Sequence, residues 1–220
     1  MKYKIYLLAA ALLMPLAAQA QWRVGTYMGA TYNDFSMDKQ YMSDFQIDGR
    51  WGTAMGVFCQ YNINEWLGVR ADLNLMQKNH RQHRSALKAV DYRFRNTYLQ
   101  LPLMASFSFG GRELRGFCNL GVYGGYWLDE WLDGTDYYYY TNSSVPVAES
   151  MSFNAERDQR WDFGFIGGVG LEYMFAHNWS VRTEVNCYYS IVSTTKQYMR
   201  VKDYRYNTTA LIQLGIVYSF

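Results

Sequence analysis

The last stretch of the chain, Tyr206–Phe220, reads YNTTALIQLGIVYSF. From Ala210 onward every second residue, including Ile212 and Leu214, is apolar or aromatic, whereas most residues between them are small or polar. Side chains of a β-strand point alternately to its two faces, so the pattern predicts a strand with one apolar face. Soluble strands usually have about five or six residues, whereas a tilted membrane strand needs about 9–11. An edge strand of a soluble sandwich is the alternative.

Repetition of this pattern along the chain decides against the sandwich. The same alternation recurs in the segments Trp22–Tyr32, Trp51–Tyr61, Trp66–Met76, Tyr98–Phe109, Leu114–Leu128, Trp161–Phe175 and Trp179–Ile191. The connections alternate as well, between short turns at 62–65, 110–113 and 176–178 and long polar stretches at 33–50, 77–92, 129–160 and 194–205. Short turns at one end and long loops at the other are typical of outer-membrane barrels. A closed barrel also pairs every backbone group, as lipid requires. We therefore predict an all-β fold, an eight-stranded antiparallel up-and-down transmembrane β-barrel.

The start of the chain and its composition agree with this prediction. Lys2 and Lys4 precede the apolar run Ile5–Leu16 and the small-x-small site at 18–20, a pattern that is typical of a cleaved signal peptide. We expect a signal peptide over residues 1–20 and one barrel domain over 21–220. Aromatic residues make up 18%, with 21 Tyr and 7 Trp, which fits aromatic girdles at two membrane interfaces. The formal charge of +2 gives no indication of nucleic-acid binding.

Charged residues also occur on the strand faces that should line the lumen. Counted upward from the short turns, six of them fall in the same half of the barrel: Arg70, Asp72, Arg115, Glu172, Arg182 and Glu184. Eight strands leave interior room only for side chains, and buried charges persist only when they are paired. We predict a compensating charge network that plugs the lumen. Arg115 is nearest its turn and is the first that we would expect to reach a hydrated rim.

Two of the long connections carry opposite charge. The second is basic and holds a single acid, Asp91, beside Lys78, Arg81, Arg84, Lys88, Arg93 and Arg95. If it faces outward, these side chains would contact the phosphates of lipopolysaccharide; a solvated loop is the alternative. The third carries Asp129, Glu130, Asp133 and Asp136 beside the run Tyr137–Tyr140. It predicts either an extended upper girdle or a binding surface.

Catalytic and metal-binding patterns are weak. His80 and His83 lie near Ser85, but nothing in the spacing fixes a nucleophile, a base and an orienting group, so we expect no catalytic residue. The His-x-x-His pair lacks an evident third ligand, and we expect no metal or other cofactor. Three scattered cysteines, Cys59, Cys118 and Cys187, share the apolar face of their strands and should face lipid unpaired.

Several motifs resemble a known family. They are Tyr98–Leu103 (YLQLPL), Leu120–Tyr126 (LGVYGGY), Asp162–Tyr173 (DFGFIGGVGLEY) and the terminal Phe220. On these residues the chain resembles the PorT-like outer-membrane β-barrel family (the "porin family" barrel domain) over essentially all of 21–220. The resemblance implies the barrel fold, an outer-membrane location, tolerance of a proline at 102, and a terminal signal read by the assembly machinery. One member is linked to type IX secretion, but most have no assigned activity, so no catalytic residue is implied.

We therefore expect a non-enzymatic outer-membrane protein with a structural or interaction role, tied to secretion or envelope assembly. A small-solute pore and a lipid-modifying enzyme are the alternatives. Both termini should be periplasmic and the long loops exposed at the cell surface. The expected partners are outer-membrane lipid and lipopolysaccharide, the assembly machinery during biogenesis, and an envelope protein that the sequence does not identify. Nucleic acid is not expected.

Overall fold

The computed structural model describes residues 22–37, 45–84, 90–111, 113–138, 140, 142–196 and 204–220. The predicted signal peptide lies outside these residues. Their strands are β1 Trp22–Met37, β2 Phe45–Asn62, β3 Leu67–Gln77, β4 His80–Arg84, β5 Asp91–Gly110, β6 Leu114–Tyr138, β7 Ser143–Ser150, β8 Trp161–Ala176, β9 Trp179–Ser190 and β10 Arg205–Ser219. No helix in these ranges is long and apolar enough to cross a membrane.

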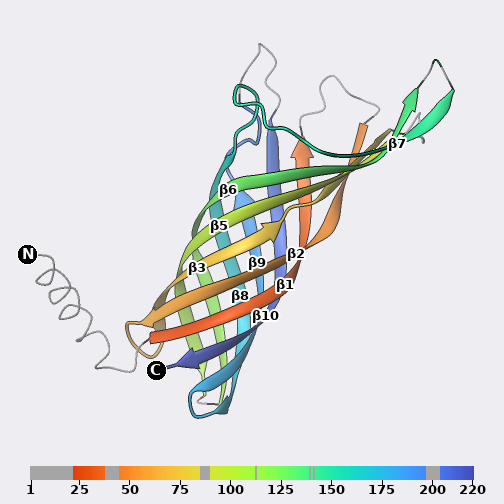
Figure 1. The fold of residues 1–220 in the computed structure, drawn as a ribbon. Coiled ribbons are helices and arrows are strands. Elements are labelled where there is room, and N and C mark those ends of the chain that lie inside the picture. Colours follow the sequence, from red (N-terminus) through yellow and green to blue (C-terminus); the bar gives the residue numbers. More distant parts are fainter. Residues whose placement is uncertain are drawn as a thin grey trace, which may run out of the picture.

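The strands form one antiparallel sheet that closes on itself (Figure 1). β1 pairs with β2 on one side and with β10 on the other, which closes the ring. β3 and β4 both lie between β2 and β5, so together they form one strand of the barrel wall, which is interrupted at 78–79. In the described chain β7 pairs with β6 alone. The wall is therefore a ring of eight strands, and the predicted barrel is confirmed.

The predicted alternation of faces is present in the wall. On β1, Met28 is 72% exposed on the outside while its neighbour Tyr27 is buried in the lumen. Two rows of aromatic pairs bound the apolar outer band. One contains Tyr32 against Trp51, with ring centres 5.3 Å apart, and the other contains Trp179 against Tyr218, at 5.0 Å. Such rows are typical of the two membrane interfaces.

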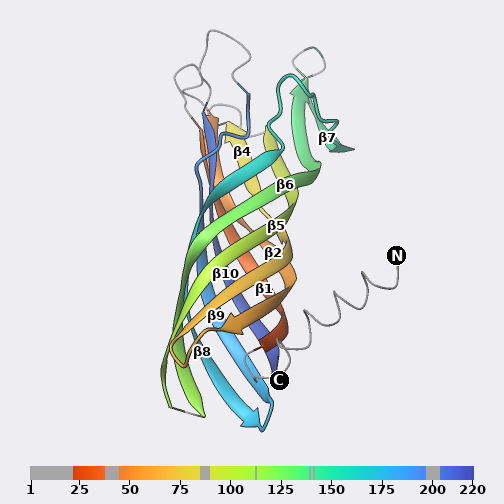
Figure 2. The ribbon, with the colours of Figure 1, turned by 90° about the vertical axis from the view of Figure 1, so that its left-hand side faces the viewer.

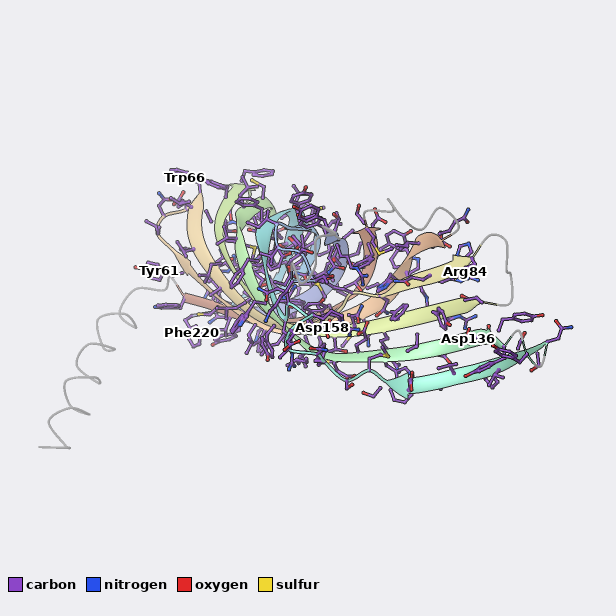
Figure 3. The ribbon with its side chains drawn as sticks, turned by 90° about the horizontal axis from the view of Figure 1, so that it is seen from above. Tyr61, Trp66, Arg84, Asp136, Asp158 and Phe220 are labelled. Atoms are coloured by element: carbon purple, nitrogen blue, oxygen red, sulfur yellow. The ribbon has the colours of Figure 1, made fainter. Side chains whose placement is uncertain are left out.

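The two ends of the barrel differ. Figure 3 shows Tyr61, Trp66 and Phe220 together at one end and Arg84 and Asp136 at the opposite end. We call the first, which carries the three short turns, the turn end, and the second the loop end. Figure 2 shows β4 and the β6–β7 hairpin at the loop end, with the hairpin standing off to one side of the barrel.

Much of the sequence that was expected to form long loops is strand, and that prediction is wrong. β1 runs on to Met37, β2 begins at Phe45 and β5 at Asp91, while the third segment contains the end of β6 and all of β7. The strands continue past the apolar band, where outward side chains become polar. The alternation that identifies a membrane strand in sequence is lost there, although the backbone ladder goes on.

Pro102 interrupts one ladder as its chemistry requires. β3 pairs with β5 at Ala71–Leu103 and again at Asn74–Gln100, and the register has no partners in between. Proline has no N–H to donate, so the gap lies where it would be expected. On the other side of β5, Pro102 stays in register with Tyr123 of β6.

The lumen is packed with apolar as well as polar side chains. Leu211 and Val217, the two apolar residues on the otherwise small or polar face of the last strand, are fully buried there. They belong to a core cluster with Tyr27, Ala54, Phe58, Met76, Met104, Tyr123, Ile166 and Tyr188. These rings and aliphatic chains surround the charged groups described next.

Candidate functional site

The turn-end half of the lumen holds a cluster of buried charges that we call the lumen network. Its members come from β1, β3, β8 and β9: Arg23, Arg70, Asp72, Glu172, Arg182 and Glu184. Three are positive and three negative, so their formal charges cancel. All six side chains are at most 7% exposed.

Arg70 lies at the centre of one half of the network. Its Nε and Nη2 donate to the carboxylate of Asp72 at 2.7 and 2.6 Å, and its Nη1 donates to Glu184 Oε2 at 2.7 Å. Glu184 also accepts from the amides of Asn119 and Gln213. The Arg70 guanidinium lies 4.1 Å from the ring centre of Phe58. A planar fork of donors is suited to bind two carboxylates at once.

Arg182 is held less completely. Its Nη1 donates to Gln60 Oε1 at 3.1 Å, while its nearest contacts to Glu184 and Glu172 are 3.6 and 3.9 Å. Its Nε and Nη2 have no hydrogen-bond partner in the described part of the chain. The guanidinium instead lies 3.6 Å from the ring centre of Phe117. Favourable contact with an aromatic face offsets part of the cost of burying the charge.

Room for the Phe117 ring comes from a glycine on the neighbouring strand. A Cβ built on Gly170 of β8 would lie 2.3 Å from that ring. Glu172, two residues further along the same face, accepts hydrogen bonds from Arg23 and from Ser180 Oγ, the latter at 2.8 Å. The inward face of β8 thus supplies both space and charge to the network.

Five of the six predicted lumen residues lie in this cluster, and the sixth does not. Arg115 is half-buried and forms no ion pair with any described residue. Arg23 binds Glu172 instead. The sequence contained the signal for Arg23, because it shares parity with Gly25 and Tyr27 on the inward face of β1.

A second layer of charge lies closer to the loop end. Lys78 Nζ is 2.6 Å from Asp162 Oδ2, and Asp162 Oδ1 accepts from Ser190 and Tyr123 at 2.6 and 3.4 Å. Lys78 was expected in the outward basic loop, and that prediction is wrong because its side chain is fully buried. Every second residue from Arg70 to Lys78 points into the lumen, because the β3–β4 wall strand continues beyond the end of its apolar outer face.

Beyond this layer the lumen opens into a cavity of about 230 Å³ at the loop end. The His80 ring stacks between Phe35 and Phe94, with ring centres 4.3 and 4.7 Å away. Burial lowers the pKa of His80 to about 3, with Arg205 and Arg50 acting in the same direction, so the imidazole is neutral.

Glu130 lies in the same cavity, and its pKa is shifted in the opposite direction from that of His80. Burial raises its pKa to about 7, and the neighbouring Asp158 adds to the rise, whereas Arg157 and Arg205 oppose it. No hydrogen bond or ion pair links the Glu130 side chain to another described residue, while Asp158 is bound by Arg157 at 2.7 Å. The cavity therefore contains a carboxyl group that no described residue binds directly.

The other five residues of the predicted basic loop differ in their surroundings. Arg81 donates to both carboxylate oxygens of Asp91 at 2.6 and 2.9 Å, and these bonds lower the pKa of Asp91. Arg84 is half-buried, and Lys88 lies outside the described residues. Arg93 and Arg95 are exposed on the outer face of β5.

Among the described residues, the predicted histidines are not brought together with a nucleophile or with further metal ligands. His80 contacts Gln82 and Asn96, His83 contacts Gln46 and Asp48, and Ser85 lies outside the described residues. Within the described ranges no three His, Cys, Asp or Glu side chains are placed to hold a metal ion. All three cysteines are free, which confirms that they are unpaired.

Comparisons with known proteins agree with this fold. Residues 6–220 match the family described as "Outer membrane protein beta-barrel domain". The structure is similar to that of OprG from Pseudomonas aeruginosa, with a TM-score of 0.53 and 16% identity over 92% of this chain and 97% of that one. It is also similar to the outer membrane protease OmpT from Escherichia coli, with a TM-score of 0.55 and 9% identity over 92% and 98%. At these identities the likeness shows the fold alone. No curated protein matches the chain in sequence.

Proposed function

We propose, since the chain belongs to the outer membrane protein beta-barrel domain family and is therefore located in an outer membrane, that it serves there as a non-enzymatic, non-conducting barrel with a structural or interaction role. The observation that carries this proposal is the filled lumen. The lumen network occupies the turn-end half, and the Lys78–Asp162 layer lies beyond it. Eight strands leave no further width for an aqueous path.

Interaction would take place at the loop end. The β6–β7 hairpin stands off from the barrel (Figure 2), and Tyr138 and Tyr140 near its tip are exposed. Exposed aromatic side chains are suited to contact another molecule. Within the family we place the chain with the PorT-like barrels, on the strand around Leu101-Pro102-Leu103, and we propose a role in secretion or envelope assembly.

The orientation that we propose puts the turn end in the periplasm and the loop end at the cell surface. Short turns and long connections have this distribution in bacterial outer-membrane barrels. An epitope inserted beside Ser144, near the hairpin tip, should react with antibody on intact cells. Reaction only after permeabilisation would show that the orientation is inverted. Outer-membrane lipid and the assembly machinery complete the partners that we propose.

A liposome-swelling assay tests the closed lumen against the small-solute pore. Proteoliposomes with the purified barrel should swell in isotonic amino acids or small sugars no faster than liposomes without protein. Swelling that rises with the amount of barrel and falls with solute size would support the pore instead. For the lipid-modifying alternative, an unchanged lipid A mass on overexpression is expected, and a new mass would contradict the proposal.

A further inference from the structure

The outer surface of the barrel carries a polar recess just beyond the apolar band at the loop end. The recess has a volume of about 290 Å³ and spans β2, the β3–β4 wall strand, β5 and β6. Three arginines line it: Arg50, Arg93 and Arg95. We call it the basic recess. Arg93 and Arg95 share parity with Leu99, which is exposed to the outside, so the recess faces away from the lumen.

Positive charge in the basic recess is incompletely neutralised. Arg93 lies opposite Asp133 in the strand register, and its Nη2 is 3.9 Å from Asp91, which Arg81 already binds. Neither Arg50 nor Arg95 forms an ion pair with another described residue. Three guanidinium groups against the one lining carboxylate leave a formal charge of +2. Planar guanidinium groups bind phosphate oxygens in pairs.

The amide side chains of the recess add a second kind of recognition. Asn79 is 6% exposed; its Nδ2 donates to the backbone oxygen of Trp51 at 2.9 Å, but its Oδ1 has no partner among the described residues. Gln77 Oε1 accepts from the Thr53 amide at 3.2 Å, so its NH2 group is the part left for another partner. A buried acceptor without a donor is costly, and a ligand hydroxyl would satisfy it.

The position of the recess in the membrane indicates which ligand would reach it. Arg50 directly precedes Trp51, which is 63% exposed and belongs to the aromatic row at the loop-end edge of the apolar band. Trp and Tyr side chains in such rows lie at the level of the lipid headgroups. Trp131, opposite Arg95 in the register, adds an aromatic wall beside the charges. The recess thus faces the headgroup layer.

We infer that the basic recess binds a phosphorylated sugar headgroup of an outer-leaflet glycolipid. The arginines would hold the phosphate, and Asn79 would accept a sugar hydroxyl. This inference rests on the proposed orientation, with the loop end at the cell surface. It also replaces the wider basic loop that the sequence predicted, because Lys78 is buried and Arg81 is bound by Asp91.

Native mass spectrometry of the detergent-solubilised protein tests the inference. The probes are bis-phosphorylated lipid A, its dephosphorylated form, glucose 6-phosphate and inorganic phosphate. Wild-type protein should bind lipid A at least tenfold more tightly than the dephosphorylated form. Arg50→Gln together with Arg95→Gln should weaken lipid A binding by at least tenfold. Arg157→Gln, which alters a half-exposed arginine outside the recess, should change it less than twofold.

Each outcome has a defined meaning. Loss of lipid A binding in the double variant, with weak binding of both soluble phosphates, supports a glycolipid ligand. Equally tight binding of glucose 6-phosphate, lost in the same variant, would overturn the lipid assignment in favour of a soluble sugar phosphate. Unchanged lipid A binding in a double variant that retains the wild-type unfolding midpoint would overturn the site. Because the test uses micelles, its failure leaves the closed lumen unaffected, and a conducting barrel would not alter its result.

Discussion

The carboxylates in the turn-end half of the lumen are hydrogen-bonded, whereas one carboxylate in the loop-end half is not hydrogen-bonded to any described residue. In the lumen network each carboxylate accepts at least two hydrogen bonds, as Glu172 does from Arg23 and Ser180. In the loop-end cavity, the carboxylate of Glu130 accepts none from the described residues. Lipid surrounds the first half and excludes water, so unpaired charge there would be very costly. The second half lies beyond the apolar band, where water or a ligand can supply the missing partner.

The largest expected effect comes from breaking the network at Glu184. Glu184→Ala removes the carboxylate that binds Arg70, Asn119 and Gln213, and should lower the free energy of unfolding by about 3–5 kcal/mol. Arg182→Ala should cost about half as much, because two of its nitrogens have no hydrogen bond to lose.

Urea unfolding of the barrel in lipid vesicles measures both variants. Glu149→Ala is the matched control, since this carboxylate is exposed on β7, and it should change the unfolding free energy by less than about 0.5 kcal/mol. Equal effects of the substitutions at 149 and 184 would contradict a dry, interdependent network.

A smaller loss is expected at the second layer. Lys78→Ala leaves Asp162 without its cation but with the hydroxyl donors of Ser190 and Tyr123, so the cost should be about 3 kcal/mol, the low end for a broken buried pair. Combining Lys78→Met with Asp162→Asn should recover part of that loss in the same unfolding assay. A double variant as unstable as the sum of its single changes would show that the two groups are not coupled.

These comparisons also show what could be predicted from the sequence. Alternation works wherever lipid lies on one side and lumen on the other, and it placed Arg70 and Glu184 inside the barrel. It failed where water replaces lipid, because Gln77 and Asn79 are as polar as the inward residues, so Lys78 was assigned to a loop. Which charged side chains meet across the lumen depends on the stagger between strands, and a single sequence does not contain that stagger.

The loop-end cavity should respond to pH through Glu130. Its pKa in the folded protein, about 7, lies above the ordinary value of 4.5, so the folded state holds its proton to higher pH than the unfolded state does. The contribution of Glu130 to stability therefore falls as pH rises from about 4.5 to about 7. Glu130→Gln should remove this loss and raise the unfolding free energy at pH 8 by on the order of 1 kcal/mol. Identical pH profiles for wild type and variant would contradict the assignment.

The smallest effects are expected on the lipid-facing surface. Cys187 is exposed on the outer face of β9, and Cys187→Ala should change stability by less than about 0.5 kcal/mol. In folded protein in vesicles, a membrane-soluble maleimide should label it and a bulky charged maleimide should react poorly. Fast labelling by the charged reagent would place Cys187 in water and contradict the assigned register.

The central claim is that paired charges and rings close the lumen, and planar-bilayer recording tests it most directly. Purified wild-type barrel should insert without steady unitary conductance, because the network around Arg70 and the Lys78–Asp162 layer leave no continuous aqueous path. Steady, reproducible open channels in wild-type protein would contradict the closed lumen and favour the small-solute pore.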